Sequence, residues 1–133
     1  MKTSSKPAQR ILVVEDERVI AVICRRVLAS EGFEVDIAAN GKTAQHMVKT
    51  NHYDYCMIDV KMPVMNGDDF YRWLQGEQPR LASRVIFTTG DVIGKGTGTF
   101  LEQSGKPFLP KPFTPDELKG LVRQVVMGCQ CLA

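Results

Sequence analysis

The chain contains the run Tyr55-Cys56-Met57-Ile58-Asp59, which is apolar up to a terminal carboxylate, and the loop sequence Val60-Lys61-Met62-Pro63-Val64-Met65-Asn66-Gly67 follows it directly. A carboxylate at the end of a buried strand, just before a loop with Pro and Gly, lies where open α/β sheets place their functional groups. Two other apolar runs end in the same way, one in Glu15-Asp16 and one in Thr89-Gly90. If the strands are parallel, three acids and a hydroxyl meet at one edge of the sheet.

Strand and helix patterns alternate five times along the chain. Strands are expected at residues 10–14, 34–38, 55–59, 84–89 and 108–110, and helices at 17–30, 42–50, from 67, 99–104 and from 115. The last helix has the clearest start, because Thr114, Pro115 and Glu117 supply an N-cap, a proline at the first helical position and a capping box. Asn40-Gly41 is expected to form a turn, and residues 75–79 a loop.

Five strand–helix units predict an α/β fold, a doubly wound parallel sheet of the flavodoxin-like type with helices on both faces. The first, third and fourth strands are continuously apolar, as strands in the centre of a parallel sheet are. The second strand is mixed in polarity and the fifth contains Pro110, which suits edge positions. The expected strand order is therefore 2-1-3-4-5, with a crevice at the ends of strands one and three.

Length and composition predict one globular domain. The chain has 133 residues, of which 44% are hydrophobic and 24% charged, with a net charge of +2. Basic residues are scattered and Arg25-Arg26 is the only adjacent pair, so a nucleic-acid partner is not expected. No apolar run is long enough to span a membrane and the start has no signal-peptide pattern, so we expect a cytoplasmic protein. Residues 1–9 are expected as a flexible tail, 10–127 as the domain and 128–133 as a second tail.

The four cysteines are expected to be reduced. Cys24 and Cys56 occupy apolar positions of a helix and a strand and are interpreted as buried free thiols. Cys129 and Cys131 form a Cys-x-Cys pair without the second ligand pair that a zinc site needs.

The acids at the predicted crevice favour a hard divalent cation. Two carboxylates about 4 Å apart repel each other by about 4 kcal/mol at an effective dielectric constant near 20. Glu15, Asp16 and Asp59 offer only oxygen ligands, and no His or Cys is placed to join them. Oxygen ligands favour Mg²⁺ or Mn²⁺ over zinc, and Mg²⁺ keeps positions open for phosphate oxygens.

Lys111 and Thr89 add the groups that bind an anion. Lys111 follows the fifth strand and reaches the same edge if that strand lies beside the fourth. Its ammonium is a mobile point charge, and Thr89 contributes a hydroxyl beside the small residue Gly90. A metal ion, an ammonium and a hydroxyl around one carboxylate are the components of phosphoryl transfer, with Asp59 as the nucleophile.

These residues, in this order and at these spacings, resemble the receiver domain of two-component response regulators over residues 10–127. The motifs that carry the resemblance are Ile11-Leu12-Val13-Val14-Glu15-Asp16-Glu17, Asp59 to Gly67, Thr89-Gly90 and Lys111-Pro112-Phe113. The resemblance implies that Asp59 accepts a phosphoryl group from the phosphohistidine of a histidine kinase or phosphotransfer domain. Such a domain signals by changing conformation and catalyses only its own phosphorylation and dephosphorylation.

The resemblance also assigns roles to individual residues. It implies that Glu15, Asp16, Asp59 and the main-chain carbonyl of Lys61 surround Mg²⁺. It implies further that Thr89 and Lys111 bind the phosphoryl oxygens, that Thr89 and Phe108 form the conformational switch, and that the Lys111-Pro112 peptide is cis. The sequences around Thr89 and Phe108 are similar to receivers of hybrid histidine kinases, so a stand-alone regulator and part of a longer kinase both remain open. A weak homodimer is compatible with either arrangement.

Two other functions fit the same fold class. The first is a phosphatase with an aspartyl nucleophile, similar to haloacid-dehalogenase-like enzymes, in which the nucleophile follows the first strand; here Asp59 follows the third. The second is a flavin-binding protein, which needs a phosphate-binding loop after the first strand, where this chain has Glu15 and Asp16. Turnover of small phosphoesters would distinguish the phosphatase from the receiver.

Overall fold

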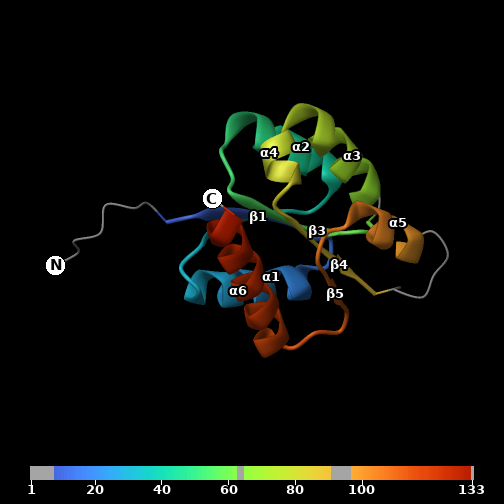
Figure 1. The fold of residues 1–133 in the computed structure, drawn as a ribbon. Coiled ribbons are helices and arrows are strands. Elements are labelled where there is room, and N and C mark those ends of the chain that lie inside the picture. Colours follow the sequence, from blue (N-terminus) through green and yellow to red (C-terminus); the bar gives the residue numbers. More distant parts are fainter. Residues whose placement is uncertain (1–7, 63–64, 91–96, 133) are drawn as a thin grey trace.

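A five-stranded parallel sheet forms the centre of the protein (Figure 1). The structure is a computed structural model that describes residues 8–62, 65–90 and 97–132. The strands are β1 (Arg10–Val14), β2 (Glu34–Ala38), β3 (Tyr55–Asp59), β4 (Val85–Thr89) and β5 (Phe108–Pro110). Their order is β2-β1-β3-β4-β5 and every neighbouring pair is parallel, which confirms the predicted topology.

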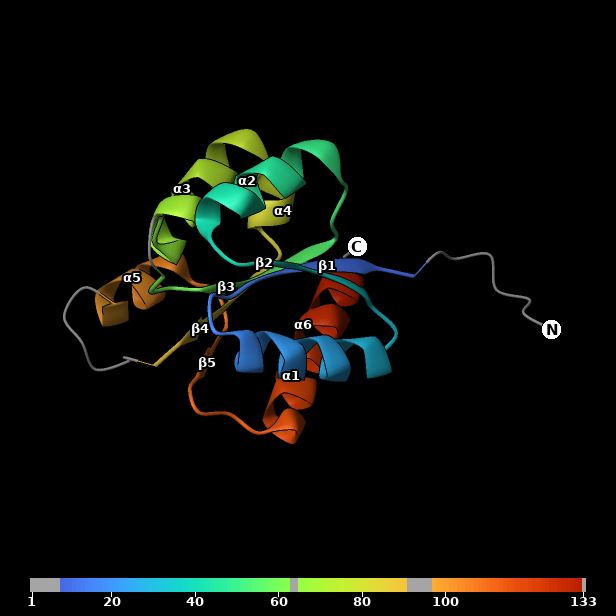
Figure 2. The ribbon, with the colours of Figure 1, turned by 180° about the vertical axis from the view of Figure 1, so that it is seen from behind.

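Helices cover both faces of the sheet. They are α1 (Arg18–Ser30), α2 (Gly41–Thr50), α3 (Gly67–Glu77), α4 (Pro79–Ala82), α5 (Thr97–Ser104) and α6 (Pro115–Leu132). α1 and α6 lie on one face, and α2, α3 and α4 lie on the other (Figures 1 and 2). Among the described residues, no helix combines the length and apolarity needed to cross a lipid bilayer.

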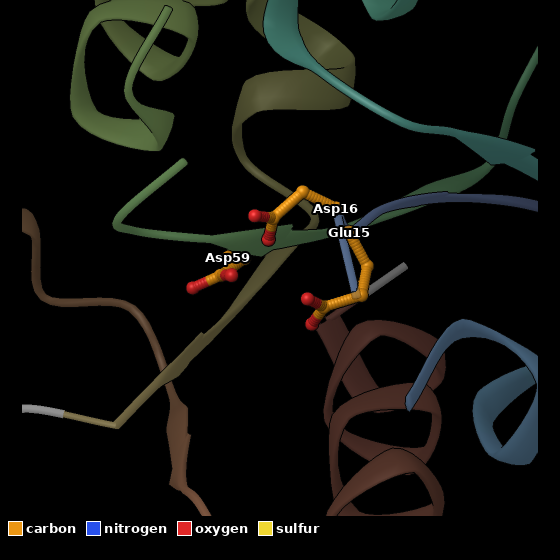
Figure 3. Close-up of side chains that lie close together, drawn as sticks. All are labelled: Glu15, Asp16 and Asp59. Atoms are coloured by element: carbon orange, nitrogen blue, oxygen red, sulfur yellow. The ribbon is translucent and has the colours of Figure 1, made fainter. Parts of the chain in front are cut away.

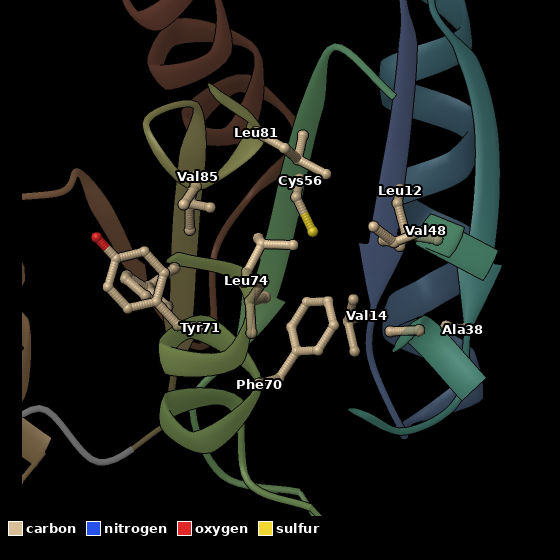
Figure 4. Close-up of a cluster of buried hydrophobic side chains, with 14 of the residues drawn as sticks. Leu12, Val14, Ala38, Val48, Cys56, Phe70, Tyr71, Leu74, Leu81 and Val85 are labelled. Carbon is tan, nitrogen blue, oxygen red and sulfur yellow. The ribbon is translucent and has the colours of Figure 1, made fainter. Parts of the chain in front are cut away.

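The sheet divides the interior into two hydrophobic cores, because successive side chains of a strand point to opposite faces. The apolar residues of β1 and β3 alternate accordingly: Leu12, Val14, Cys56 and Ile58 belong to the core beneath α2, α3 and α4, and Ile11, Val13, Tyr55 and Met57 to the core beneath α1 and α6. Figure 4 shows the first core, where Phe70 of α3 lies beside Val14 of β1. Cys24 and Cys56 are buried free thiols, one in each core, as predicted.

An aromatic cluster fixes α5 to the rest of the protein. Tyr71 of α3, Phe87 of β4 and Phe100 of α5 contact one another edge to face, with ring centroids 5.1 to 5.9 Å apart. Each such pair contributes about 0.5–1.5 kcal/mol beyond the burial of its surface. Leu101 of α5 is buried in the same core.

Three local predictions were wrong. Asn40 is the N-cap of α2 and accepts a hydrogen bond from the amide of Thr43, so α2 begins at Gly41 instead of after a turn. The expected loop at 75–79 is occupied by the end of α3 and the start of α4, because Leu74 and Leu81 are both buried in the core and hold these turns against the sheet. α6 continues to Leu132, through the segment that we expected to be a tail.

Other local expectations are confirmed. The capping box of α6 is present in both directions: the amide of Glu117 donates to Thr114 Oγ1, and the amide of Thr114 donates to Glu117 Oε1. The fourth predicted helix is short but begins at Thr97, two residues before the expected start. Residues 1–7 of the expected tail, Gly94 and Gly96 of the glycine-rich segment, and the side chains of Cys129 and Cys131 lie outside the described residues.

Gly67, the first residue of α3, packs directly against the end of β3. Its amide donates to the carbonyl of Val60 at 2.8 Å, so the backbone turns back on itself directly after the strand. A Cβ atom at this position would clash with the carbonyl oxygen of Asp59. Only glycine fits, and the close approach fixes the first turn of α3 against the residue that ends β3.

We predict that Gly67→Ala lowers the free energy of unfolding by about 2–3 kcal/mol, because the added methyl group must displace the backbone of Asp59. Gly76→Ala, in the same helix but with nothing within 4 Å of the added Cβ, should raise it by about 0.5 kcal/mol. Urea unfolding of the two variants measures both effects. Equal stabilities would show that the turn after β3 is not closely packed.

Candidate functional site

Three carboxylates meet at the carboxyl ends of β1 and β3. Glu15 and Asp16 directly follow β1, and Asp59 is the last residue of β3. One oxygen atom of each group lies within 4.8 Å of the others. Figure 3 shows the three side chains directed toward a common space. The neighbouring pairing of β1 and β3 creates this arrangement, as the strand order predicted.

Lys111 brings a positive charge to the same place from the other edge of the sheet. Its Nζ lies 2.9 Å from Glu15 Oε1, 3.1 Å from Asp59 Oδ2 and 3.4 Å from Glu17 Oε1. The side chains of Glu15 and Asp59 are 3% and 5% exposed and that of Lys111 is 11% exposed, whereas the Glu17 side chain is 62% exposed. The two short contacts are therefore shielded from solvent and the third lies at the rim.

Burial dominates the electrostatics of the two enclosed acids. It raises the pKa of Glu15 to about 7, with a smaller contribution from the charge of Asp59, and the hydrogen bond from Lys111 only partly opposes this shift. Burial also raises the pKa of Asp59. Burial alone would lower the pKa of Lys111, but the nearby Glu15 and Asp59 outweigh it and raise the pKa. The ammonium thus stays charged between two acids that are hard to ionise together.

Main-chain groups hold these side chains in place. The amide of Lys61 donates to Asp59 Oδ1 at 3.3 Å, and the amide of Glu17 donates to Glu15 Oε2 at 3.1 Å. The amide of Lys111 donates to the carbonyl of Thr89 at 2.7 Å, which continues the pairing of β4 with β5. The position of the ammonium is therefore linked to the hydrogen-bonding pattern of the sheet.

A cavity of about 250 Å³ opens above the carboxylates. It is lined by Asp16, Glu17, Asp59, Lys61, Gly90 and Lys111. Gly90 is exposed and leaves one side open, while Thr89 is fully buried at the end of β4. A group the size of a phosphate can approach the carboxylate of Asp59 through this opening.

The structure brings most of the predicted site residues together. Glu15, Asp16, Asp59 and Lys111 form one cluster, and the Lys111-Pro112 peptide is cis as expected. Phe108 lies on β5, next to the strand that Thr89 ends; it is 38% exposed and paired in register with Phe87 of β4.

Glu17 is a residue that our sequence reasoning missed. It occupies the N-cap position of α1, yet its side chain accepts no capping hydrogen bond and instead contacts Lys111. The signal was present as a third acid in Glu15-Asp16-Glu17, although its spacing alone did not distinguish it from a solvated residue.

The donor set fits a hard divalent cation. Carboxylate oxygens on two adjacent strand ends, without nitrogen or sulfur ligands, are the groups that Mg²⁺ prefers. Asp16 is exposed while Glu15 and Asp59 are buried, so one side of the cluster remains open to water and to a substrate oxygen. Three carboxylates against one ammonium leave a negative charge that such a cation would neutralise.

Comparison with known proteins relates this cluster to a family. The family model described as "Response regulator receiver domain" matches residues 11–123. The alkaline phosphatase synthesis transcriptional regulatory protein SphR of Synechococcus elongatus is 33% identical over 136 residues, which cover 96% of this chain and 52% of SphR. The chain spans about half the length of the curated relatives it matches.

Two solved structures of receiver domains from histidine kinases are similar to this chain. One is the signal receiver domain of a signal transduction histidine kinase from Syntrophus aciditrophicus, with 29% identity and a TM-score of 0.80, covering 91% of this chain and 92% of that one. The other is from a sensor histidine kinase of Pseudomonas aeruginosa PAO1, with 27% identity and a TM-score of 0.77, covering 90% of this chain and 98% of that one. That structure has a magnesium ion coordinated in its active-site cleft.

We predict that Lys111→Met lowers the free energy of unfolding by about 2–4 kcal/mol in metal-free buffer, because it leaves two buried carboxylates without their cation. Lys106→Met is the matched control, since the exposed Lys106 ammonium makes a long contact of 3.4 Å to the carbonyl of Ser83 and its loss should cost less than about 0.5 kcal/mol. Chemical denaturation of both variants tests this. Similar losses in the two would show that the buried contacts of Lys111 do not stabilise the fold.

Proposed function

Because the chain belongs to the response regulator receiver domain family, and is thus a phosphoacceptor of two-component signalling, we propose that Asp59 is the residue that accepts the phosphoryl group. The observation that supports this assignment most directly is the position of its carboxylate. Asp59 lines the cavity, 3.1 Å from the Lys111 ammonium and beside the other two acids. Glu15 is also buried, but it does not line the cavity.

In the proposed reaction a carboxylate oxygen of Asp59 attacks the phosphorus atom of a phosphohistidine in the donor protein. The new bond is P–O, the bond that breaks is P–N, and the imidazole leaves with the electron pair and takes up a proton. The product on this chain is an acyl phosphate, which water can later hydrolyse to restore Asp59. The chain's own contribution is to hold the nucleophile in place and to neutralise the oxygens of the transferred group.

Receiver domains coordinate Mg²⁺ in this acidic site, and we assign the ligands of this chain as Glu15, Asp16, Asp59 and the main-chain carbonyl of Lys61. Mn²⁺ would fit the same oxygen ligands. When bound, the cation neutralises carboxylate charge and polarises the oxygens of the incoming phosphoryl group. Lys111 would then be free to move from the carboxylate of Asp59 to a phosphoryl oxygen, since both are anionic acceptors within its reach.

Thr89 and Phe108 are proposed to convert phosphorylation into a conformational change. Thr89 is buried at the end of β4, next to the site, and its carbonyl accepts a hydrogen bond from Lys111. A phosphoryl group on Asp59 offers the Thr89 hydroxyl a new acceptor. Phe108 lies on the neighbouring strand with part of its ring in solvent, so a shift of Thr89 toward the phosphoryl group would give this ring room to pack inward.

The partner is proposed to be a histidine kinase or phosphotransfer domain, which would supply the phosphohistidine. Relatives include both transcriptional regulators and receivers of histidine kinases, so a separate regulator and a part of a longer kinase are both compatible with the site. Residues 10–127 would form the working domain in either setting, and a weak homodimer would be an additional means of output. Membership of a signalling family disfavours the phosphatase alternative, as does the position of Asp59 after β3 instead of β1.

Phosphorylation by a small-molecule donor tests whether Asp59 is the phosphoacceptor. Incubation with acetyl phosphate and Mg²⁺ should add the mass of one phosphoryl group to the protein, and Asp59→Asn should abolish this addition because the amide is a poor nucleophile. Asp54→Asn is the control, since Asp54 lies just before β3, at the other end of the same strand. Intact-mass spectrometry distinguishes these results. Phosphorylation of the Asp59→Asn protein would place the acceptor elsewhere, and steady turnover of small phosphoesters would favour a phosphatase.

Stabilisation of the fold by Mg²⁺ tests the proposed metal site. Mg²⁺ at ten times its dissociation constant should raise the free energy of unfolding by about 1.4 kcal/mol, because it binds only the folded chain. Asp16→Asn removes an exposed ligand without disturbing the buried pair and should shift this response to higher Mg²⁺ concentration. Asp69→Asn, on the exposed first turn of α3, should leave it unchanged. An identical Mg²⁺ response in all three proteins would place the metal outside this cluster.

A further inference from the structure

Glu17 is an acid of the reactive cavity to which the proposed reaction assigns no role. It lines the cavity of about 250 Å³ together with Asp59 and Lys111, and its side chain is 62% exposed. Within residues 8–62, 65–90 and 97–132, the carboxylates that could hold one metal ion are Glu15, Asp16 and Asp59, and Glu17 is not among them. Its place at the rim of the cavity therefore calls for a different explanation.

The Glu17 carboxylate contacts Lys111 and does not cap its own helix. Glu17 is the N-cap of α1, with an extended backbone, and its side chain makes no capping hydrogen bond. Its Oε1 instead lies 3.4 Å from Lys111 Nζ, 94 residues away along the chain. The backbone is held on both sides, because the Glu17 amide donates to Glu15 Oε2 and the Glu17 carbonyl accepts the amide of Ala21. The side chain therefore extends from a fixed point toward the ammonium.

The ammonium of Lys111 has three N–H groups, and three carboxylates surround it. Its Nζ lies 2.9 Å from Glu15, 3.1 Å from Asp59 and 3.4 Å from Glu17. Glu15 and Asp59 are ligands that we assign to Mg²⁺, so their oxygens would be shared between the ammonium and a cation that repels it. Among these three contacts, the one with Glu17 is the contact that metal binding leaves intact.

We propose that Glu17 is a positioning residue for phosphoryl transfer, which keeps the Lys111 ammonium at the rim of the cavity while the buried carboxylates hold a cation. The inference rests on the proposed role of Asp59 as the phosphoacceptor. Gly90 is exposed beside the same opening, so a phosphoryl oxygen that enters there meets an ammonium already in place. Lysine has a flexible stem, and an anchored head reduces the conformational freedom that is lost during transfer. Glu17 does not touch the reacting atoms and acts through Lys111.

Glu17→Asp separates this role from a structural one. Aspartate keeps the negative charge but is one methylene shorter, and it is among the strongest N-cap residues, so its carboxylate should turn to the amides of α1 and leave Lys111. The midpoint of thermal unfolding in EDTA should rise by about 2–4 °C, because α1 gains a cap. Phosphorylation by acetyl phosphate at saturating Mg²⁺, followed by intact-mass spectrometry, should slow by about two- to fivefold, which corresponds to the free energy of an exposed ion pair. A residue with a merely structural role would not give a protein that is more stable and reacts more slowly.

Hydrogen exchange of the Lys111 ammonium tests the contact without metal. In EDTA, the three carboxylates should slow the exchange of its protons with water, and NMR spectroscopy of isotope-labelled protein measures this rate. Loss of one acceptor in Glu17→Asp should speed the exchange by about two- to fivefold. Glu77→Asp is the matched control, because it makes the same substitution at the exposed end of α3, outside the cavity, and should change neither the exchange nor the phosphorylation.

The outcomes distinguish the role of Glu17 from that of Asp59. Phosphorylation of Glu17→Asp at the wild-type rate would overturn the proposal. A slower rate with unchanged exchange of the Lys111 ammonium would overturn it as well, because the effect would not pass through that contact. A wild-type protein that gains no phosphoryl mass would instead contradict the role of Asp59, and this inference with it.

Discussion

The contact of one ammonium with two buried carboxylates is the interaction on which the remaining organisation of this protein depends. Glu15 and Asp59 lie close together at less than a tenth of their full exposure, a situation that is costly unless a positive charge accompanies them. Lys111 is 52 residues from Asp59 and 96 from Glu15 along the chain. A parallel sheet with β1 and β3 adjacent, and with β5 following β4, makes these distant residues neighbours.

The two hydrophobic cores supply the stability that this charged edge requires. Strands buried on both faces have little freedom to shift, because a slip of one residue would exchange the side chains of the two cores. The first turn of α3 is similarly restricted by the contact between Gly67 and the backbone of Asp59. Asp59, the proposed nucleophile, is therefore fixed from the strand before it and from the helix after it, which is the preorganisation that charge-based catalysis needs.

Much of this architecture could be predicted from the sequence, because the signals were repeated and local. Continuous apolar strands, a capping box and acids at strand ends each have one dominant physical explanation, and together they determine the strand order and the site. The errors arose where local signals competed with tertiary packing. Gly76 and Pro79 indicate a loop, but burial of Leu74 and Leu81 keeps that segment helical. Glu17 was missed because its partner, Lys111, is known only once the chain has folded.

The hydrogen bond from the amide of Lys111 to the carbonyl of Thr89 has a broader consequence. It makes the separation between the Lys111 backbone and the end of β3 a property of strand spacing, which is nearly invariant in proteins, so that only the Lys111 side chain must move to reach Asp59. Connecting segments around the reactive edge are then free to diverge in length and chemistry without altering the reaction. A domain built in this way can acquire new signalling partners through its surface while its chemistry stays constant.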